Sequence, residues 1–218
     1  TAEWETTAAV QAVREAAVPL QLTTWAGVGR SREALALIEK LPQSPPDPLL
    51  AVVLGLDQLA QVPQENLSFD FSSLFLAAVK RLLPEREKLP PAAQSQFDSA
   101  RLRCLLIADQ DQDAANLAVQ IEQTLGDEPT RWERFGQQLE ERPRRALAPV
   151  AQRVWRKIES HRKAGTPEWL AARTAVIRQT VLIPDPLEAA KLLKLTRVLY
   201  GRIADAATRA EWDRLERS

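Results

Sequence analysis

The apolar residues of this chain recur at intervals of three and four, a spacing typical of helices that bury one face. The alternation of apolar and polar residues that marks a strand is hard to find over a strand's length. We therefore predict an all-α fold. The five clearest apolar stripes are Ala34/Leu35/Ile38/Leu41, Phe75/Leu76/Val79/Leu82, Ala114/Leu117/Ala118/Ile121/Leu125, Leu147/Val150/Ala151/Val154/Ile158 and Ala189/Leu192/Leu193/Leu199.

Proline and glycine residues separate these stripes and predict about ten or eleven helices of ordinary length. A proline in the first helical turn wastes no hydrogen-bond donor, so an N-cap residue followed by proline marks a helix start. Three such pairs are Asp47-Pro48, Thr166-Pro167 and Asp185-Pro186. Pro149 falls inside an apolar stripe and predicts a kink or a helix boundary there.

The stripes also repeat along the chain. Ala34 and Phe75 are 41 residues apart, and Phe75 and Ala114 are 39 residues apart. A period near 40 has room for two helices, and a helical hairpin needs neighbouring hairpins to complete its core. We predict an array of stacked antiparallel helical hairpins, an α-solenoid, that spans residues 1–218 as a single domain. An irregular all-helical bundle is the alternative.

The charges are unevenly distributed although the net charge is zero. Residues 1–128 carry 18 acidic and 10 basic side chains, whereas residues 129–218 carry 11 acidic and 19 basic ones. This asymmetry suggests a subdivision near residues 126–130, with an acidic N-terminal part and a basic C-terminal part. Such polarity can steer a charged partner or join the ends of two molecules in a homo-oligomer.

Three stretches, residues 25–38, 108–118 and 166–193, resemble the hairpins of the tetratricopeptide repeat (TPR) family. Ala34, Ala114 and Ala189 stand where that family has a small residue near the start of its second helix, and Trp169 resembles its early first-helix tryptophan. The family unit has 34 residues, shorter than the period of this chain. The resemblance implies a solenoid that binds peptides or other proteins on a concave face.

Motifs for metal, cofactor or nucleophilic chemistry are incomplete in this chain. Asp109, Asp111 and Asp113 begin like a calcium-binding loop, but Ala114 and Gln120 stand where that loop needs glycine and glutamate. We expect a turn that leads into a helix instead. His161 and Cys104 are the one histidine and the one cysteine, so a zinc site is excluded. We expect a solvated histidine, a buried thiol, and no catalytic, cofactor-binding or metal-binding residue.

The strongest local signal is positive charge in residues 142–163, which hold eight basic side chains and one acid, Glu159. Such a face can simply be solvated, can dock an acidic protein, or can contact phosphates with a tryptophan available for stacking. Nucleic acid is disfavoured because the chain as a whole is neutral. The candidate partner-binding residues are Trp132, Arg145, Arg153, Trp155, Arg156, Lys157 and Lys163.

We expect a non-catalytic scaffold that binds another protein or a peptide through a groove and this basic face. An enzyme with carboxylate acid and base residues on an all-helical scaffold is the alternative; it would need two carboxylates in an enclosed pocket. The longest apolar run, residues 49–56, is too short to cross a membrane. The chain contains no methionine, so we also expect an excised domain, an accessory part of a longer protein or a matured secreted protein, and the compartment stays open.

Overall fold

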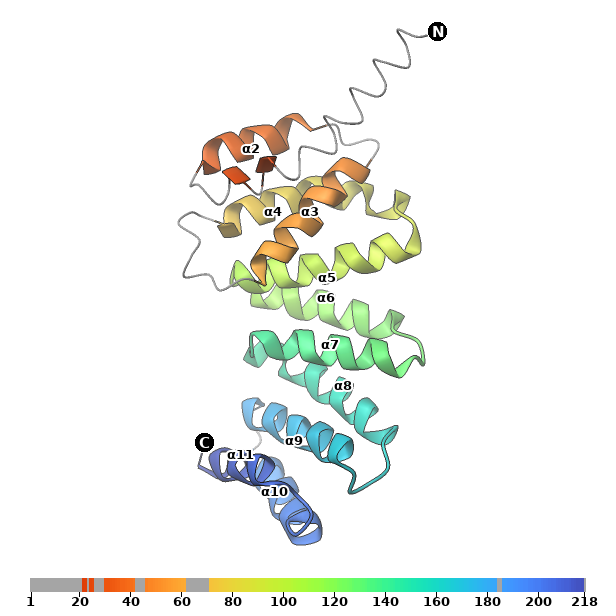
Figure 1. The fold of residues 1–218 in the computed structure, drawn as a ribbon, viewed down its shortest axis with the longest axis vertical. Helices are drawn as coiled ribbons and strands as arrows, with labels where there is room; N and C mark the ends of the chain where they lie inside the picture. The colour runs from red at the N-terminus through yellow and green to blue at the C-terminus, as the bar shows by residue number, and fades with distance from the viewer. Residues whose placement is uncertain are drawn as a thin grey trace, which may run out of the picture. The chain divides into compact units, whose positions relative to one another are not determined.

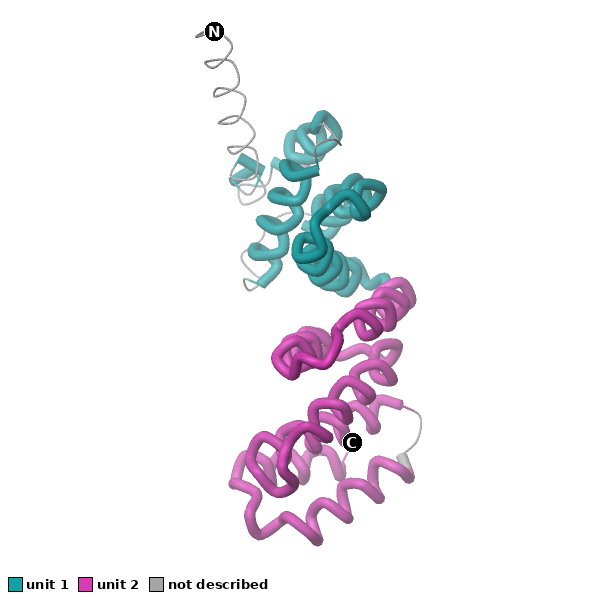
Figure 2. Tube along the Cα trace, turned by 90° about the vertical axis from the view of Figure 1, so that its right-hand side faces the viewer, with its two compact units in different colours: residues 1–110 teal, residues 111–218 magenta. Residues whose placement is uncertain are grey.

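The computed structural model describes residues 21–22, 24–25, 30–41, 46–61, 71–183 and 186–217. This part of the chain contains ten α-helices, two 3₁₀ helices and no strand, which confirms the predicted all-α class (Figure 1). The chain divides into two compact units, residues 1–110 and 111–218 (Figure 2). The single domain and the charge boundary near 126–130 remain predictions. The helical-hairpin solenoid also remains a prediction.

Unit 1 packs its helices around one apolar core. Helix α3 contacts α4 and α5, and α4 also contacts α2 and α5. The predicted stripes form the buried faces: Ala34 and Ile38 in α2, and Phe75, Val79 and Leu82 in α4, are at most 2% exposed. The described elements are α2 (Ser31–Lys40), α3 (Asp47–Ala60), α4 (Phe71–Leu82), η2 (Leu83–Lys88) and α5 (Pro91–Ile107).

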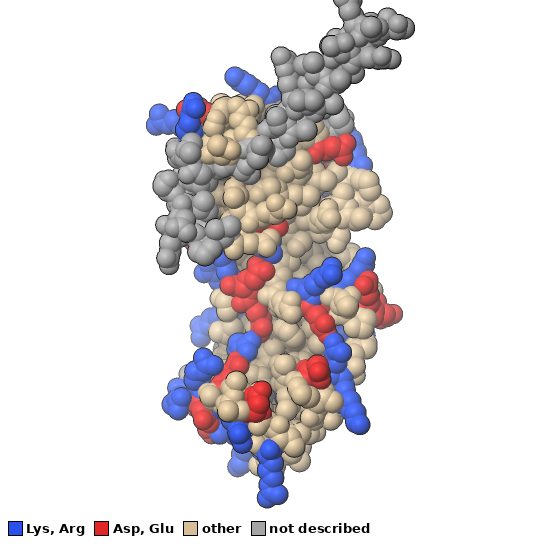
Figure 3. All heavy atoms as spheres, viewed as in Figure 1, with Lys and Arg blue, Asp and Glu red and all other residues tan. Residues whose placement is uncertain are grey.

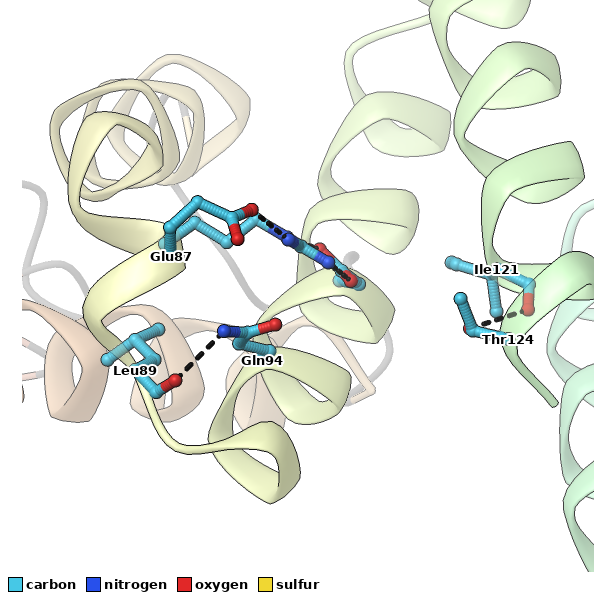
Figure 4. Close-up of polar contacts among 7 residues, drawn as sticks. Glu87, Leu89, Gln94, Ile121 and Thr124 are labelled. Atoms are coloured by element: carbon cyan, nitrogen blue, oxygen red, sulfur yellow. Dashed lines mark hydrogen bonds and ion pairs between the residues drawn. The ribbon is translucent and has the colours of Figure 1, made fainter. Parts of the chain in front are cut away.

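Polar side chains fix the joint between η2 and α5. The Arg86 guanidinium donates to both carboxylate oxygens of Asp98 on α5, at 2.8 and 2.5 Å. The Gln94 amide donates to the Leu89 carbonyl at 2.9 Å (Figure 4). A guanidinium that meets a carboxylate with two parallel bonds is held in one orientation, so this turn has a defined geometry.

Unit 2 is built around helix α9. Helix α8 lies between α7 and α9, and α9 also contacts α10 and α11. Helix α6 packs on η3 and α8. The elements are α6 (Asp111–Thr124), α7 (Pro129–Glu141), η3 (Arg145–Leu147), α8 (Ala148–Ser160), α9 (Pro167–Leu182), α10 (Pro186–Tyr200) and α11 (Ala206–Glu216).

One predicted helix start is confirmed and one is wrong, and the helix boundary predicted at Pro149 is confirmed. Thr166 caps α9, with its hydroxyl oxygen accepting from the Trp169 backbone N–H at 3.3 Å, and Pro149 lies in the first turn of α8. Helix α3 instead begins at Asp47 itself, and Pro46, which has no side-chain acceptor, stands at the cap position. The predicted cap at Asp185 lies outside the described residues.

The interior of α9 is polar as well as apolar, and the side chains of its buried threonines are paired. Thr174 accepts from the Trp212 indole N–H at 2.8 Å. Thr180 donates to the Val176 carbonyl at 2.8 Å and accepts from the Gln152 amide at 2.7 Å. Since an unpaired buried polar group is costly, this pairing lets α9 be surrounded by neighbours on all sides.

Helix α10 departs from its predicted stripe. Ala189 and Leu193 are buried against the unit, 5% and 4% exposed, as the spacing predicts. Leu199, the last member of that stripe, is 61% exposed, so its predicted burial is wrong. The apolar residues of α10 cover a wider part of the helix circumference than the part that packs on α9. Leu199 lies in the part that α9 does not cover.

We expect Thr174→Val to destabilise the folded chain. The substitution keeps the shape of the side chain but removes the acceptor of the Trp212 indole, which is 1% exposed. An unsatisfied donor in the core costs about 1–3 kcal/mol, so urea unfolding should show a loss of that size. Thr130→Val, at an exposed site, is the control and should stay within about 0.5 kcal/mol of wild type. Equal stability of the two variants would contradict the assignment of the buried bond.

We expect the Cys104 thiol to be inert in the folded chain. Burial, aided by the nearby charge of Asp57, raises the pKa of this thiol to about 12, so the reactive thiolate is scarce at neutral pH. An aromatic disulfide reagent at pH 8 should modify Cys104 only after the chain is unfolded in guanidinium. Rapid stoichiometric labelling of the folded chain would show that the thiol is accessible.

Candidate functional site

The arginines of the predicted basic face are paired with acids of neighbouring helices. On α8, Arg153 donates to both oxygens of Glu122 in α6, at 2.9 and 2.5 Å, and Arg156 contacts Glu188 of α10 at 2.7 Å. After α8, Arg162 pairs with Glu133 of α7. On the face of the molecule drawn in Figure 3, acidic and basic side chains lie side by side. The pairs dilute the positive charge that the sequence concentrates in residues 142–163.

Three other cations of this segment are less tightly held. Lys157 lies 3.9 Å from Asp127, whereas Arg145 and Lys163 are exposed and make no ion pair with any residue that the structure describes. The structure therefore does not gather the seven candidate residues into one uniformly positive surface. Their role in binding a partner stays a prediction.

Trp132 and Trp155, the two tryptophans among the candidate partner-binding residues, are partly buried. The Trp132 indole donates to the Gly126 carbonyl at 2.8 Å, and the Lys157 ammonium lies 6.0 Å from the centre of its ring. Trp155 packs on α7 where that helix has Gly136: a Cβ atom there would lie 3.1 Å from the indole. Both rings are thus already engaged within the unit, which reduces the face that either offers for stacking.

An open pocket of about 480 Å³ lies in unit 2, among α8, the turn that follows it, α9 and α10. Its wall combines three guanidinium groups with one carboxylate, a hydroxyl, an indole and one leucine. The lining residues are Arg156, Glu159, Ser160, Arg162, Trp169, Arg173 and Leu192. Charged groups and hydrogen-bond donors converge here beside one indole and one leucine, so the pocket is more polar than a typical small-molecule site.

Arg173 is held in the pocket by two side chains. Its guanidinium contacts Glu159 at 2.8 Å and lies 5.0 Å from the centre of the Trp169 ring. Trp169 in turn packs against Tyr200 of α10, with 4.7 Å between ring centres. Stacking on an aromatic face together with an ion pair fixes the plane of a guanidinium. The Nε of Arg173 is buried and has no hydrogen-bond partner.

Glu159 is the one carboxylate in the wall of this pocket. Burial raises the pKa of Glu159 above its usual value, although the charges of Arg173 and Arg156 act in the opposite direction. An acid–base mechanism with two carboxylates would need a second one here, and the pocket does not supply it. The arrangement suits recognition of a group that brings its own negative charge.

The outer side of α10 is an apolar surface next to this pocket. Five large apolar side chains on it are between 52% and 83% exposed: Leu187, Leu195, Val198, Leu199 and Ile203. Lys191, Lys194 and Arg202 are exposed among them and make no ion pair within the described part of the chain. We call these eight residues the α10 face. Grouped exposure of this kind is unusual on a surface that meets only water.

The remaining sequence candidates have structural roles. Asp109 occupies a turn with φ of 52°, and Asp111 and Asp113 lie in the first turn of α6, as expected for a turn that leads into a helix. His161 follows α8 and is exposed, with Nδ1 2.7 Å from the Lys157 carbonyl oxygen. The described residues contain no metal-binding group of three or more His, Cys, Asp or Glu. None of the helices in the described ranges has the length and apolar character needed to span a bilayer.

Sequence reasoning missed the pocket and the α10 face. Arg173 and Trp169 are four residues apart and so share a side of α9, which is a signal readable from sequence. The contribution of α10 is different, because Leu192 joins Arg173 in the pocket wall only through the packing of α10 on α9. The exposure of Leu195 and Val198 also depends on which side of α10 lacks a neighbour.

We expect Glu159→Gln to change how stability depends on pH. Because the pKa of Glu159 is raised by folding, its contribution is complete below the unfolded-state pKa of about 4.3 and is lost as the pH rises through the folded-state pKa. The glutamine variant lacks that loss, so its stability relative to wild type should increase between pH 4 and pH 7. Chemical unfolding at several pH values measures this difference.

Glu168→Gln is the matched control for this titration. The pKa of Glu168 is lowered by hydrogen bonds at the start of α9, from its own backbone N–H and from Thr166. Its contribution is present above the unfolded-state pKa and is lost as the pH falls, so its glutamine variant should show the opposite trend. Parallel trends in the two variants would mean that the attraction of Arg173, and not burial, governs Glu159.

No protein-family model, curated protein or solved structure matches this chain. Its function is therefore inferred from the geometry of the pocket and of the α10 face.

Proposed function

We propose that this chain is a non-catalytic, TPR-like module of helical hairpins that binds another protein by accepting an acidic amphipathic helix on the α10 face. The observation that carries this proposal is the group of five exposed apolar side chains on and just after α10. Burying them in a complex removes apolar surface from water at about 25 cal/mol per Å². An amphipathic helix covers such a surface with residues spaced at three and four.

The charges beside the apolar residues indicate the chemistry of the partner. Lys191, Lys194 and Arg202 are all positive, so aspartate and glutamate flanking the partner's apolar side would complement them. A second copy of this chain, docked by the same face, would instead bring like charges together. A lipid surface fits less well, because the polar pocket opens beside Leu192 on the same helix.

The alternative of an enzyme receives less support from this geometry. The pocket is open, and its one carboxylate is paired with Arg173. The buried small residues Ala34, Ala114 and Ala189 agree with the helix approach that the TPR resemblance implies. The concave groove remains part of the proposal as a secondary contact surface, together with Arg145, Lys157 and Lys163, the less tightly held cations of residues 142–163.

The proposal is tested by selecting peptides of about 16 residues from a random displayed library against the whole chain. We expect the enriched peptides to be acidic and amphipathic, with leucine-type residues spaced at three and four. Their affinities are then measured by fluorescence anisotropy. Leu195→Asp/Leu199→Asp, which puts carboxylates on the α10 face, should weaken binding at least about tenfold.

Leu83→Asp is the matched control, because Leu83 is an exposed leucine of unit 1, 36% exposed. It should change the affinity less than about twofold. Enriched peptides that are basic or neutral, or whose binding survives the α10 double substitution, would overturn the proposal. So would wild-type dimers in sedimentation velocity that the same substitution dissociates, or binding of wild type to anionic phospholipid vesicles that it abolishes.

A further inference from the structure

The pocket and the α10 face are continuous along one side of α10. Leu192 lines the pocket, and Leu195 and Leu199 follow it three and seven residues later, on the same side of the helix. The turn after α8 reaches the far end of this strip: a Cβ atom on Gly165, whose φ is +84°, would lie 3.3 Å from the Ile203 side chain. A helix laid along Leu195 and Leu199 therefore passes the open side of the pocket.

The pocket wall keeps unused donor capacity. A guanidinium has five N–H donors, and each of these arginines forms an ion pair through Nη2: Arg156 with Glu188, Arg162 with Glu133 and Arg173 with Glu159. The Ser160 hydroxyl donates to the Lys157 carbonyl. Three of the lining side chains are guanidinium groups and one is a carboxylate, and although each guanidinium is ion-paired, each has further N–H donors that a bound acceptor can use.

The arrangement of the three guanidinium groups favours a planar anion such as a carboxylate. Arg173 is held between Glu159 and the Trp169 ring, so its donors are oriented before a ligand arrives. Arg156 reaches the pocket from α8, and Arg162 reaches it from the turn that follows. Carboxylates accept from guanidinium groups in one plane, and a preoriented guanidinium loses less freedom on binding.

The inference from these observations rests on the docking proposed above and identifies the contact that fixes the docked helix in place. We propose that one Glu or Asp carboxylate of the docked helix enters the pocket and is held by Arg156, Arg162 and Arg173. The apolar strip provides contact area, and the pocket fixes the position of the partner along α10, since only one register places an acidic side chain opposite the opening. The partner is thereby an acidic helix with one carboxylate at a fixed distance from its apolar residues.

The test is a double-mutant cycle with the enriched peptides and the whole chain. Each acidic residue of a peptide is changed in turn to its amide, and each peptide is titrated against wild type and Arg156→Gln. We expect one peptide position at which the amide weakens binding about three- to tenfold with wild type. With Arg156→Gln, the same change should cost less than about twofold, because the interaction is already lost.

Arg153→Gln is the matched control for this cycle. Arg153 and Arg156 lie on α8, their side chains are both 50% exposed, and each pairs with a glutamate of another helix, but only Arg156 lines the pocket. Arg153→Gln should therefore leave the sensitive peptide position unchanged. Arg162→Gln is a second pocket variant, and circular dichroism with urea unfolding checks that every variant is folded.

The outcomes separate the two proposals. If peptides bind through the α10 face but no acidic position couples to Arg156 or Arg162, the pocket inference is wrong and the docking stands. If an acidic position couples equally to Arg153, the effect is general electrostatics and the pocket inference is again wrong. If no peptide depends on Leu195 and Leu199, the docking fails and the carboxylate anchor fails with it.

Discussion

The arrangement of unit 2 depends on the burial of helix α9. This helix contacts α8, α10 and α11, and its interior threonines are satisfied by partners such as the Trp212 indole and the Gln152 amide. On a helix packed in this way, charged side chains are accommodated only at the edges of the buried surface. There Arg178 bridges Glu140 and Glu211, while Arg173 pairs with Glu159. The pocket lies at the edge of this buried surface that carries Arg173.

Helix packing also explains why a strongly basic segment does not give a strongly basic surface. Arg153 and Glu122 are 31 residues apart, and Arg156 and Glu188 are 32 residues apart, yet packing places each pair in contact. Exposed pairs of this kind add only about 0–1 kcal/mol each to stability. Their larger consequence is electrostatic: they weaken the field that residues 142–163 would project and make Lys191 and Lys194 of α10, which form no ion pair with any described residue, more prominent.

The helices and most buried positions could be predicted because they follow from local spacing. Ala34, Ala114 and Val154 are fully buried, and each belongs to a stripe read directly from the sequence. Leu199 belongs to such a stripe too and is exposed, because burial also requires a neighbour on the correct side. The pocket could not be predicted for the same reason: Arg156, Arg173 and Leu192 come from three helices, and no local pattern specifies how those helices meet.

On the α10 face, apolar contacts provide affinity and polar contacts fix the register of the bound helix. Leu195, Leu199 and Val198 gain little from the folding of this chain, since they stay more than half exposed, but a partner that covers them gains their burial. Apolar contacts of this kind do not fix the position of the partner along α10, because two rows of leucines can pack together in more than one register. The Arg173 donors, which Trp169 and Glu159 hold in place, do fix that position, since a carboxylate can reach them at one place only. Specificity on this helix therefore depends on the polar pocket, and binding strength depends on the apolar strip beside it.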